Sequence, residues 1–536
     1  MRDEKIEKLL SFAGNQNRYQ YFALMIFLFL WMNCNFMAVV LPYLERQPLI
    51  AYKDSNNTIH SNEGLTTEMC GQEYEILERF GYSWISEFNI ECNKFMIGLI
   101  GVFTFIGNTM GSVAFSIITK YLSHKKILII SSFGFSISIF ICTLIHSINY
   151  FYCLFGCLIF VGLFGNCLCY SSLVVCEEMI SSNKRSFFSS IINMGYGLCG
   201  IMYSLIFMFI QNWRYDFYIL IGFSMILCLL IWLFIYDSPR TYIDNKDLDS
   251  TKKILEGIAS FNGIKEEFLE KFESKECQEL INEIMKLDHD GDEKEGVELE
   301  DINQQKDDLA QEDTNTTLIE VKYDEKKEKK VKKKKKSEKM TAFSSLKYPS
   351  LRYKFLILCI LWFGTRSTSN CISLSSKALP GNYYFNIIFL FIFESTAYYI
   401  SGILINIQSL GRKGALWSQY LIITISFLLL SFFKLPNSYE LGLNYIVRFC
   451  AAAIELVFYT YTLEVYPTPV RSVNFGMNVT FGNIGSILSP LIYEYLPNSV
   501  FLFIFAMFSI VHSILLIFLP ETVGRPMIET IDELKE

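Results

Sequence analysis

Twelve long apolar segments constrain the fold of this chain more than any other feature. Each has about 20 residues, which is the length that a helix needs to cross the hydrocarbon core of a bilayer. Lipid offers no hydrogen-bond partner to the backbone, so such segments must be helices or a closed barrel, and they lack the alternation of barrel strands. We therefore expect an all-α membrane protein with twelve transmembrane helices. The segments start near Tyr21, Phe95, Ile127, Tyr150, Phe187, Tyr215, Tyr353, Tyr384, Gly414, Leu443, Ser472 and Val500.

The composition supports this interpretation, because 51% of the 536 residues are hydrophobic and 19% are charged, against about 25% charged in soluble domains. The charged residues lie in a few segments between long apolar stretches, so the net charge of −7 describes no single part of the chain. It indicates no nucleic-acid partner. Twelve of the 15 cysteines lie in apolar stretches, where we expect free thiols that pack as small hydrophobic groups. The blocks divide the chain into an N-terminus (1–20), a first six-helix bundle (21–236), a middle segment (237–352), a second six-helix bundle (353–519) and a C-terminus (520–536).

The distribution of lysine and arginine predicts the orientation, since these residues favour short loops on the cytoplasmic side. We expect both termini and the middle segment to be cytoplasmic, and the loop 44–94 to be extracytoplasmic. The basic residues of the short connections on the cytoplasmic side are Lys120, Lys125, Lys126, Lys184, Arg185, Arg412, Lys413 and Arg471.

The loop 44–94 carries two candidate modification sites. Asn56 begins an Asn-x-Thr sequence, the acceptor pattern for N-glycosylation. Cys70 and Cys92 can form a disulfide on an oxidising extracytoplasmic side, and the alternative is two unpaired thiols.

The middle segment changes character along its length. Residues 251–262 have helical periodicity, whereas residues 288–339 are acidic and then lysine-rich with few apolar residues, so we expect this charged insert to be disordered. The run Lys332–Lys336 either contacts anionic lipid or is simply solvated. Residues 288–292 superficially resemble a calcium loop, but Glu293 and Leu299 stand where Gly and an acid are needed, so no metal site is expected.

Five short strings follow one another along the chain in a characteristic order. They are Phe88–Cys92, Asp237–Arg240, Gly381–Tyr384 with Glu394, Glu464–Arg471 and Leu519–Pro526. In their order these strings resemble the signatures of the organic cation, organic anion and carnitine transporters of the major facilitator superfamily. The resemblance implies two six-helix bundles, the major facilitator fold, around a substrate site near the middle of the membrane.

In this family, charged residues at the cytoplasmic helix ends pair between helices and latch the bundles in the outward-facing state. The resemblance therefore implies gating roles for Glu178 with Arg185, Glu464 with Arg471, and Glu521 with Arg525. Each residue can instead be an ordinary solvated charge at a membrane edge. Two family acids are missing: one from the segment 119–126, and one at Gln408. We expect the latch to be weakened.

Four charged residues lie well inside predicted helices: Arg366, Glu394, Arg448 and Glu455. Because a charge at the bilayer centre costs about 3 kcal/mol or more, such residues mark a cavity or a pathway. Arg448, Ala452, Glu455, Tyr459 and Thr462 recur every three or four residues and so share one helix face. Arg448 and Glu455 are placed to bracket a zwitterion, and the alternative is that they neutralise each other or Arg366 and Glu394.

The family resemblance places Asn483 where a helix-eleven residue sets charge preference, and here that residue is neutral. With two acids and two bases in this half, a zwitterion or organic cation is favoured over an organic anion. Aromatic residues could also hold a quaternary ammonium by cation–π contact, although most will serve packing alone. The candidates are Trp362, Tyr398, Tyr399 and Tyr459.

The sequence thus predicts a carrier of a small organic ion, a cation or a carnitine-like zwitterion, that works by alternating access. We expect a monomer in the plasma membrane that needs no cofactor. The alternatives are a non-transporting receptor or sensor with this fold, and a carrier of organic anions or sugars. An enzyme is not expected, because we find no convincing catalytic or metal-binding constellation.

Overall fold

The computed structural model describes two compact units, one made of residues 1–20 and 239–347 and the other of residues 21–238 and 348–536. The described residues are 2–14, 17–53, 59–63, 74–119, 121–147, 151–180, 182–244, 247–275, 277–281, 283, 348–404 and 411–522. The charged insert 288–339 lies outside them, as do Asn56, Cys70 and Arg525.

The first unit contains short helices from the N-terminus and the middle segment. Asp247 caps α11 by accepting a hydrogen bond from the Ser250 N–H, and Gly263 ends the helix with a φ of 77°, a conformation that glycine adopts without strain. This confirms the helix predicted over 251–262. Leu9, Leu255, Ile258 and Phe268 are buried in the unit. The helices are α1 (Arg2–Phe12), α10 (Pro239–Asp244), α11 (Leu248–Asn262) and α12 (Lys265–Glu273).

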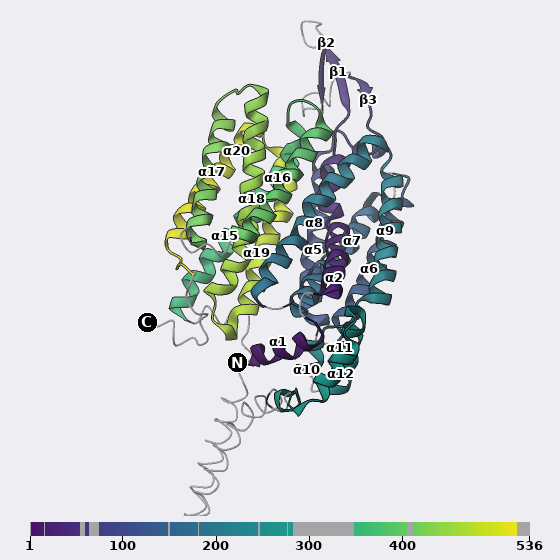
Figure 1. The fold of residues 1–536 in the computed structure, drawn as a ribbon. Helices are drawn as coiled ribbons and strands as arrows, with labels where there is room; N and C mark the ends of the chain where they lie inside the picture. Colours follow the sequence, from purple (N-terminus) through teal and green to yellow (C-terminus); the bar gives the residue numbers. More distant parts are fainter. Residues whose placement is uncertain are drawn as a thin grey trace, which may run out of the picture. The chain divides into compact units, whose positions relative to one another are not determined.

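The second unit contains the long helices, which form two groups (Figure 1). Among the described residues, eleven spans are long and apolar enough to cross a membrane, with α2 and α3 counted as one, and α19 is a further helix of 28 residues. This confirms the predicted twelve-helix membrane fold. The first-half helices are α2 (Arg18–Cys34), α3 (Phe36–Leu44), α5 (Lys94–Ile118), α6 (His124–Thr143), α7 (Phe151–Glu178), α8 (Ser182–Phe209) and α9 (Trp213–Phe234). The second-half helices are α15 (Pro349–Ser375), α16 (Tyr383–Leu404), α17 (Arg412–Phe432), α18 (Asn437–Val465), α19 (Thr468–Tyr495) and α20 (Asn498–Ile517).

The two halves meet through α8 against α16 and α5 against α19. Glycines make these approaches close. A Cβ at Gly197 would lie 2.8 Å from the Phe391 carbonyl oxygen, and one at Gly101 would lie 2.6 Å from the Pro490 side chain. Small residues at such crossings let helix backbones approach without side chains between them.

We call the helix ends that adjoin residues 45–93 the loop side, and the ends that adjoin residues 237–348 the insert side. On the loop side, an antiparallel sheet of order β2-β1-β3 forms from β1 (Leu49–Lys53), β2 (Ile59–Glu63) and β3 (Tyr74–Glu78). The short helix α4 (Trp84–Phe88) follows, and its Glu87 lies 2.5 Å from Arg214 at the start of α9. Cys92 is disulfide-bonded, and its pairing with Cys70 stays a prediction.

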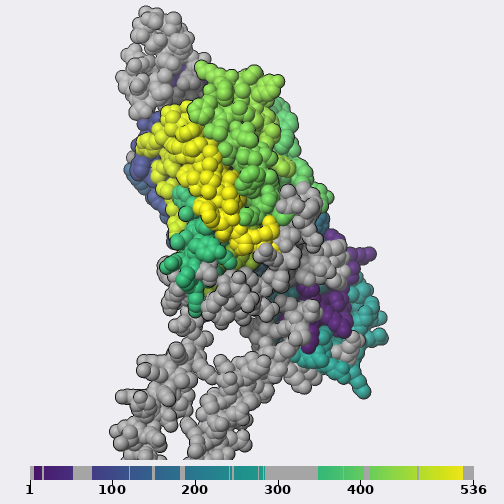
Figure 2. All heavy atoms as spheres, turned by 90° about the vertical axis from the view of Figure 1, so that its left-hand side faces the viewer, coloured from purple at the N-terminus to yellow at the C-terminus, as the bar shows by residue number. Residues whose placement is uncertain are grey.

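The outward helix faces carry large apolar side chains that protein atoms do not cover. Figure 2 looks onto this face of the second half, where segments coloured green to yellow form the surface. A soluble monomer rarely exposes so much contiguous apolar surface, whereas a lipid environment solvates it. Exposed examples on α17 and α20 are Trp417, Ile425, Phe432, Val511, Ile514 and Ile517.

Candidate functional site

A cavity of about 110 Å³ lies between the two halves. Helices α2, α3, α5, α7 and α8 line it from the first half, and α15, α16, α18 and α19 line it from the second. The first half contributes amides and aromatic rings, while every charged residue of the lining comes from the second half. The lining includes six asparagines: Asn35, Asn108, Asn166, Asn193, Asn370 and Asn483.

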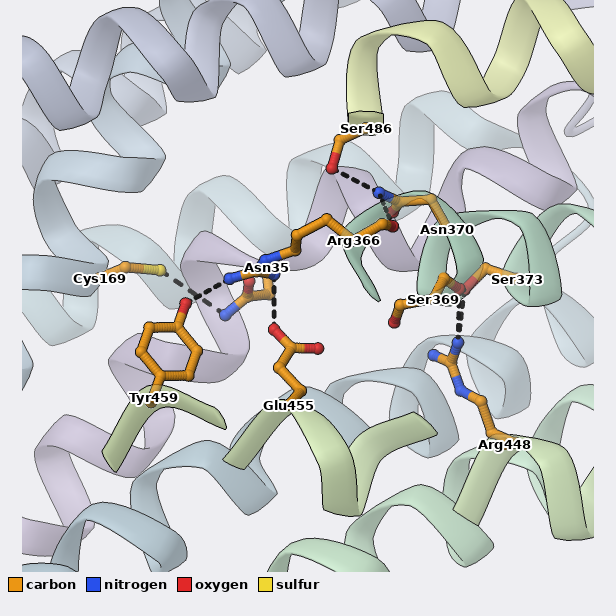
Figure 3. Close-up of polar contacts among 10 residues, drawn as sticks. All are labelled: Asn35, Cys169, Arg366, Ser369, Asn370, Ser373, Arg448, Glu455, Tyr459 and Ser486. Carbon is orange, nitrogen blue, oxygen red and sulfur yellow. Dashed lines mark hydrogen bonds and ion pairs between the residues drawn. The ribbon is translucent and has the colours of Figure 1, made fainter. Parts of the chain in front are cut away.

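Arg366 on α15 and Glu455 on α18 form an ion pair at the cavity, with Nη1 and Oε1 2.6 Å apart. The other guanidinium nitrogen of Arg366 donates to the Tyr459 hydroxyl, as Figure 3 shows. The Arg366 side chain is 24% exposed and that of Glu455 is 13% exposed. Both residues line the cavity, so a ligand in the cavity can contact both charges.

Arg448 on α18 pairs instead with Glu394 on α16, with Nη2 and Oε2 2.6 Å apart. Its Nη1 donates to the Ser369 carbonyl oxygen at 3.2 Å and to the Ser373 hydroxyl at 2.7 Å, and its Nε also donates to Glu394. Arg448 is only 2% exposed, and Glu394, but not Arg448, is part of the cavity lining. The guanidinium is therefore occupied by protein groups on all three nitrogens.

The structure thus divides the four membrane charges into two pairs, Arg366 with Glu455 and Arg448 with Glu394. The bracket predicted from the α18 stripe, with Arg448 and Glu455 facing one ligand, is not the arrangement seen. The pairing corresponds to the alternative in which each charge is neutralised by its neighbour. Only the Arg366–Glu455 pair lies at the cavity with both of its members.

Of the other residues predicted to form the site, some line the cavity and some do not. Asn483, Tyr398 and Tyr459 line the cavity. Trp362 is buried beside it, donating its indole N–H to the Thr462 hydroxyl at 3.0 Å. Tyr399 is 46% exposed and outside the cavity lining, so it has no place in the site.

Sequence reasoning missed the contribution of the first half. Asn35 lies between α2 and α3, and its side-chain N–H donates to the Trp31 carbonyl oxygen at 2.8 Å. Tyr170 and Tyr196 also line the cavity. The sequence does contain a signal for these asparagines, since an amide inside an apolar helix needs a polar partner.

Two cysteines beside the cavity do not follow the expectation of free thiols. Cys34 at the end of α2 and Cys169 on α7 form a disulfide, with Cα atoms 6.2 Å apart. The neighbouring Asn35 side chain approaches Cys169 Sγ at 3.6 Å. These two cysteines therefore do more than pack as small hydrophobic groups, because their bond joins two helices of the first half next to the cavity lining.

On the insert side, three of the predicted gating residues, Glu464, Arg471 and Glu521, make contacts within the second half. Glu464 pairs with Arg412 of α17 at 2.7 Å, whereas its predicted partner Arg471 donates from Nε to the Tyr466 carbonyl oxygen at 3.2 Å. The Glu521 carboxylate accepts hydrogen bonds from the backbone N–H groups of Arg412 and Lys413, at 3.0 and 3.1 Å.

The first half has an equivalent contact, because Asp237 after α9 accepts from the Lys125 N–H at the start of α6, at 3.3 Å. A carboxylate at a helix N-terminus satisfies backbone donors and the helix dipole. Glu178 has a buried Oε2 with no hydrogen bond from the described residues. The side chains of Arg185 and Arg525 lie outside the description, so the roles of these three stay predictions.

On the loop side, charged and aromatic side chains of the two halves are in contact. Lys377, after α15, lies 2.8 Å from Glu45 at the end of α3 and 3.6 Å from Glu494 of α19. The Arg46 guanidinium lies 4.2 Å from the centre of the Tyr383 ring. Burial raises the pKa of Glu45 to about 7, against the opposing effect of Lys377.

Comparison with known proteins places this architecture. The model of the Major Facilitator Superfamily matches residues 21–490. The chain is 25% identical to solute carrier family 22 member 6 of Rattus norvegicus, covering 89% of this chain and 78% of the relative. It is 24% identical to organic cation/carnitine transporter 2 of Homo sapiens, covering 88% and 75%.

Among solved structures, the inward-open conformation of the xylose transporter XylE from E. coli superposes with a TM-score of 0.63. The match covers 96% of this chain and 99% of the XylE chain at 12% sequence identity. At this identity the similarity supports the fold alone. The resemblance seen in the short sequence strings is thus confirmed. The chain belongs to the major facilitator superfamily, as a membrane transporter of the solute carrier family 22 type.

Proposed function

We propose that this transporter carries a small organic cation or zwitterion, and that the substrate binds in the cavity between the halves. The observation that carries the proposal is the Arg366–Glu455 pair, the one place in the described cavity lining where a guanidinium and a carboxylate both meet the open space. A zwitterion can bind to both members of such a pair, since its anionic end can pair with the Arg366 guanidinium and its cationic end with the Glu455 carboxylate.

The balance of charge favours a cationic group. The cavity lining contains the carboxylates of Glu394 and Glu455 and the single guanidinium of Arg366, while Arg448 lies behind Glu394. Aromatic rings of Trp31, Tyr170 and Tyr398 complete the walls and add cation–π attraction of about 1 kcal/mol each. The relatives named for organic cations and carnitine support the same class.

Alternating access follows from the division into halves. We expect the loop side to open when Lys377 separates from Glu45, while the insert side closes. We propose that both termini are cytoplasmic, because of the distribution of lysine and arginine along the chain. We propose the plasma membrane as the location of the protein. The two missing family acids slightly favour a sensor, but the relatives named as transporters favour a carrier.

Uptake of labelled cations, zwitterions, anions and sugars into proteoliposomes tests the proposal. We expect uptake of a cation or zwitterion that is reduced about tenfold in Glu455→Gln, since hydrogen bonds to charged groups contribute about 1.5–3 kcal/mol. Glu440→Gln is the control, because Glu440 lies on the same helix but outside the cavity lining. Uptake of anions or sugars alone would contradict the proposal.

A further inference from the structure

Four of the cavity asparagines have their amide nitrogen already engaged by the protein. In each case a backbone carbonyl oxygen accepts from the side-chain NH2 group, and the side-chain oxygen accepts no hydrogen bond from the described residues. The pairs are Asn35 to Trp31 at 2.8 Å, Asn193 to Ser189 at 2.8 Å, Asn370 to Arg366 at 3.1 Å, and Asn166 to Asn108.

The chemistry of the acceptor fixes which way each amide is turned. A backbone carbonyl oxygen can only accept a hydrogen bond, so the group that faces it must be the NH2 group. The opposite rotation would bring two acceptors together within about 3 Å, which is repulsive. Two of the amides have a second oxygen acceptor on the same nitrogen: Ser486 Oγ for Asn370 at 2.7 Å and Ser112 Oγ for Asn166 at 2.8 Å.

The cavity consequently offers more acceptors than free N–H donors: among the described lining residues, Arg366 Nε and the Asn483 side-chain nitrogen are the buried nitrogens without a hydrogen-bond partner. The four amide oxygens remain for a ligand, together with the carboxylates of Glu394 and Glu455. The strongest donor of the lining, Arg366, is engaged by Glu455 and Tyr459. A buried acceptor that receives no hydrogen bond is unfavourable, so a ligand without N–H or O–H groups leaves several oxygens unsatisfied.

We infer that the substrate is a primary or secondary ammonium compound, with hydroxyl groups, and not a quaternary ammonium compound. Protonated amines present two or three N–H donors, whereas a trimethylammonium group presents none and fills more of the cavity of about 110 Å³. This inference rests on the proposed function, because it requires the cavity to be the substrate site.

Matched pairs of compounds that differ only in N-methylation provide the test. Ethanolamine is compared with choline, and 4-amino-3-hydroxybutyrate with its N-trimethyl form, as labelled substrates and as competitors in proteoliposomes of the full chain. We expect each amine to be preferred at least about tenfold, because a site built to donate or accept hydrogen bonds rejects an analogue that lacks them. Equal or better uptake of the trimethyl compounds would overturn this inference and leave the proposed function intact. Absence of uptake of every cation and zwitterion would overturn both.

One variant pair shows whether the amides cause the preference. Asn193→Leu removes an amide whose side-chain nitrogen donates, among the described residues, to a carbonyl oxygen of its own helix, so the fold should be retained. Asn444→Leu is the matched control, since Asn444 makes the same contact with the carbonyl oxygen four residues earlier, at 2.8 Å, outside this cavity. We expect the amine preference to fall at least about threefold in the first variant, a change of roughly 0.7 kcal/mol, and not in the second. An unchanged preference in Asn193→Leu, with normal uptake, would contradict the assignment.

Discussion

Arg366 and Glu455 lie on different helices, yet their charged groups meet 2.6 Å apart beside the cavity between the halves. Arg448 and Glu394 meet at the same distance, but almost without exposure. The two pairs therefore have different expected roles, one in contact with a ligand and one in holding α16 against α18, and mutations can separate these roles.

Replacing Glu455 with Gln should reduce uptake of cationic or zwitterionic substrates about tenfold with normal expression, because the pair is partly exposed to the cavity. The relevant second-site change is Arg366→Met, not a change at Arg448. A double-mutant cycle on uptake measures the coupling. Recovery of full uptake in the double variant would indicate a purely structural pair.

Replacing Glu394 with Gln should instead destabilise the protein, since it leaves the buried Arg448 guanidinium without its counter-charge. Breaking a buried pair costs about 3–5 kcal/mol. We expect lower expression and a lower melting temperature in detergent, partly restored by the additional change Arg448→Met. If Glu394→Gln melts like the native protein, the pair does not hold the helices together.

The loop-side contact should respond to pH. Lys377 lies between two carboxylates, so the buried cluster carries one excess negative charge until Glu45 binds a proton. Burial raises the pKa of Glu45 from its ordinary 4.5 to about 7, and opening would return it to the ordinary value. The state with the higher pKa gains stability as pH falls, so closure should be favoured progressively below about pH 7.

Distances between spin labels on the loop-side ends of α9 and α20 can measure this. The closed population should rise between about pH 8 and about pH 5 in the native protein, and should not change in Glu45→Gln. A larger open population at low pH would reverse the predicted sign.

Replacing Asn483 with Asp tests the cavity assignment from α19. Asn483 lines the cavity, so an added carboxylate should raise the preference for cations over zwitterions by about threefold or more. Competition assays with matched compounds measure the ratio. An unchanged selectivity profile at normal expression would place the substrate elsewhere.

The predicted orientation is testable on intact cells. Protease added from outside should not cleave within 326–339, because the lysine-rich part of the middle segment is expected to be cytoplasmic. Permeabilised cells provide the control. Cleavage from outside in intact cells would contradict the orientation.

The helices and the family followed from the sequence, because apolar length and short local strings are properties of contiguous residues. The partners within the charge pairs did not follow from the sequence. Arg448 and Glu455 share a helix face, and that periodicity suggested a common ligand, but the partner of each comes from another helix. Glu464 likewise pairs with Arg412, 52 positions away, and not with Arg471 on the neighbouring connection.

The amides of the first half show a second limit. Asn35, Asn166 and Asn193 are single polar residues in apolar helices, and each alone could serve an ordinary helix contact. Their importance arises only because three helices bring them to one cavity. Convergence of this kind depends on packing between distant segments, which periodicity does not encode.

Both charge pairs at the cavity belong entirely to the second half, while the first half presents neutral groups there. If the halves move relative to each other without bound substrate, no opposite charges at the cavity have to separate in a medium of low dielectric constant. The conformational change of the empty transporter therefore has a small electrostatic cost at this level of the membrane. A carrier needs this property in order to return to its starting conformation after it has released the substrate.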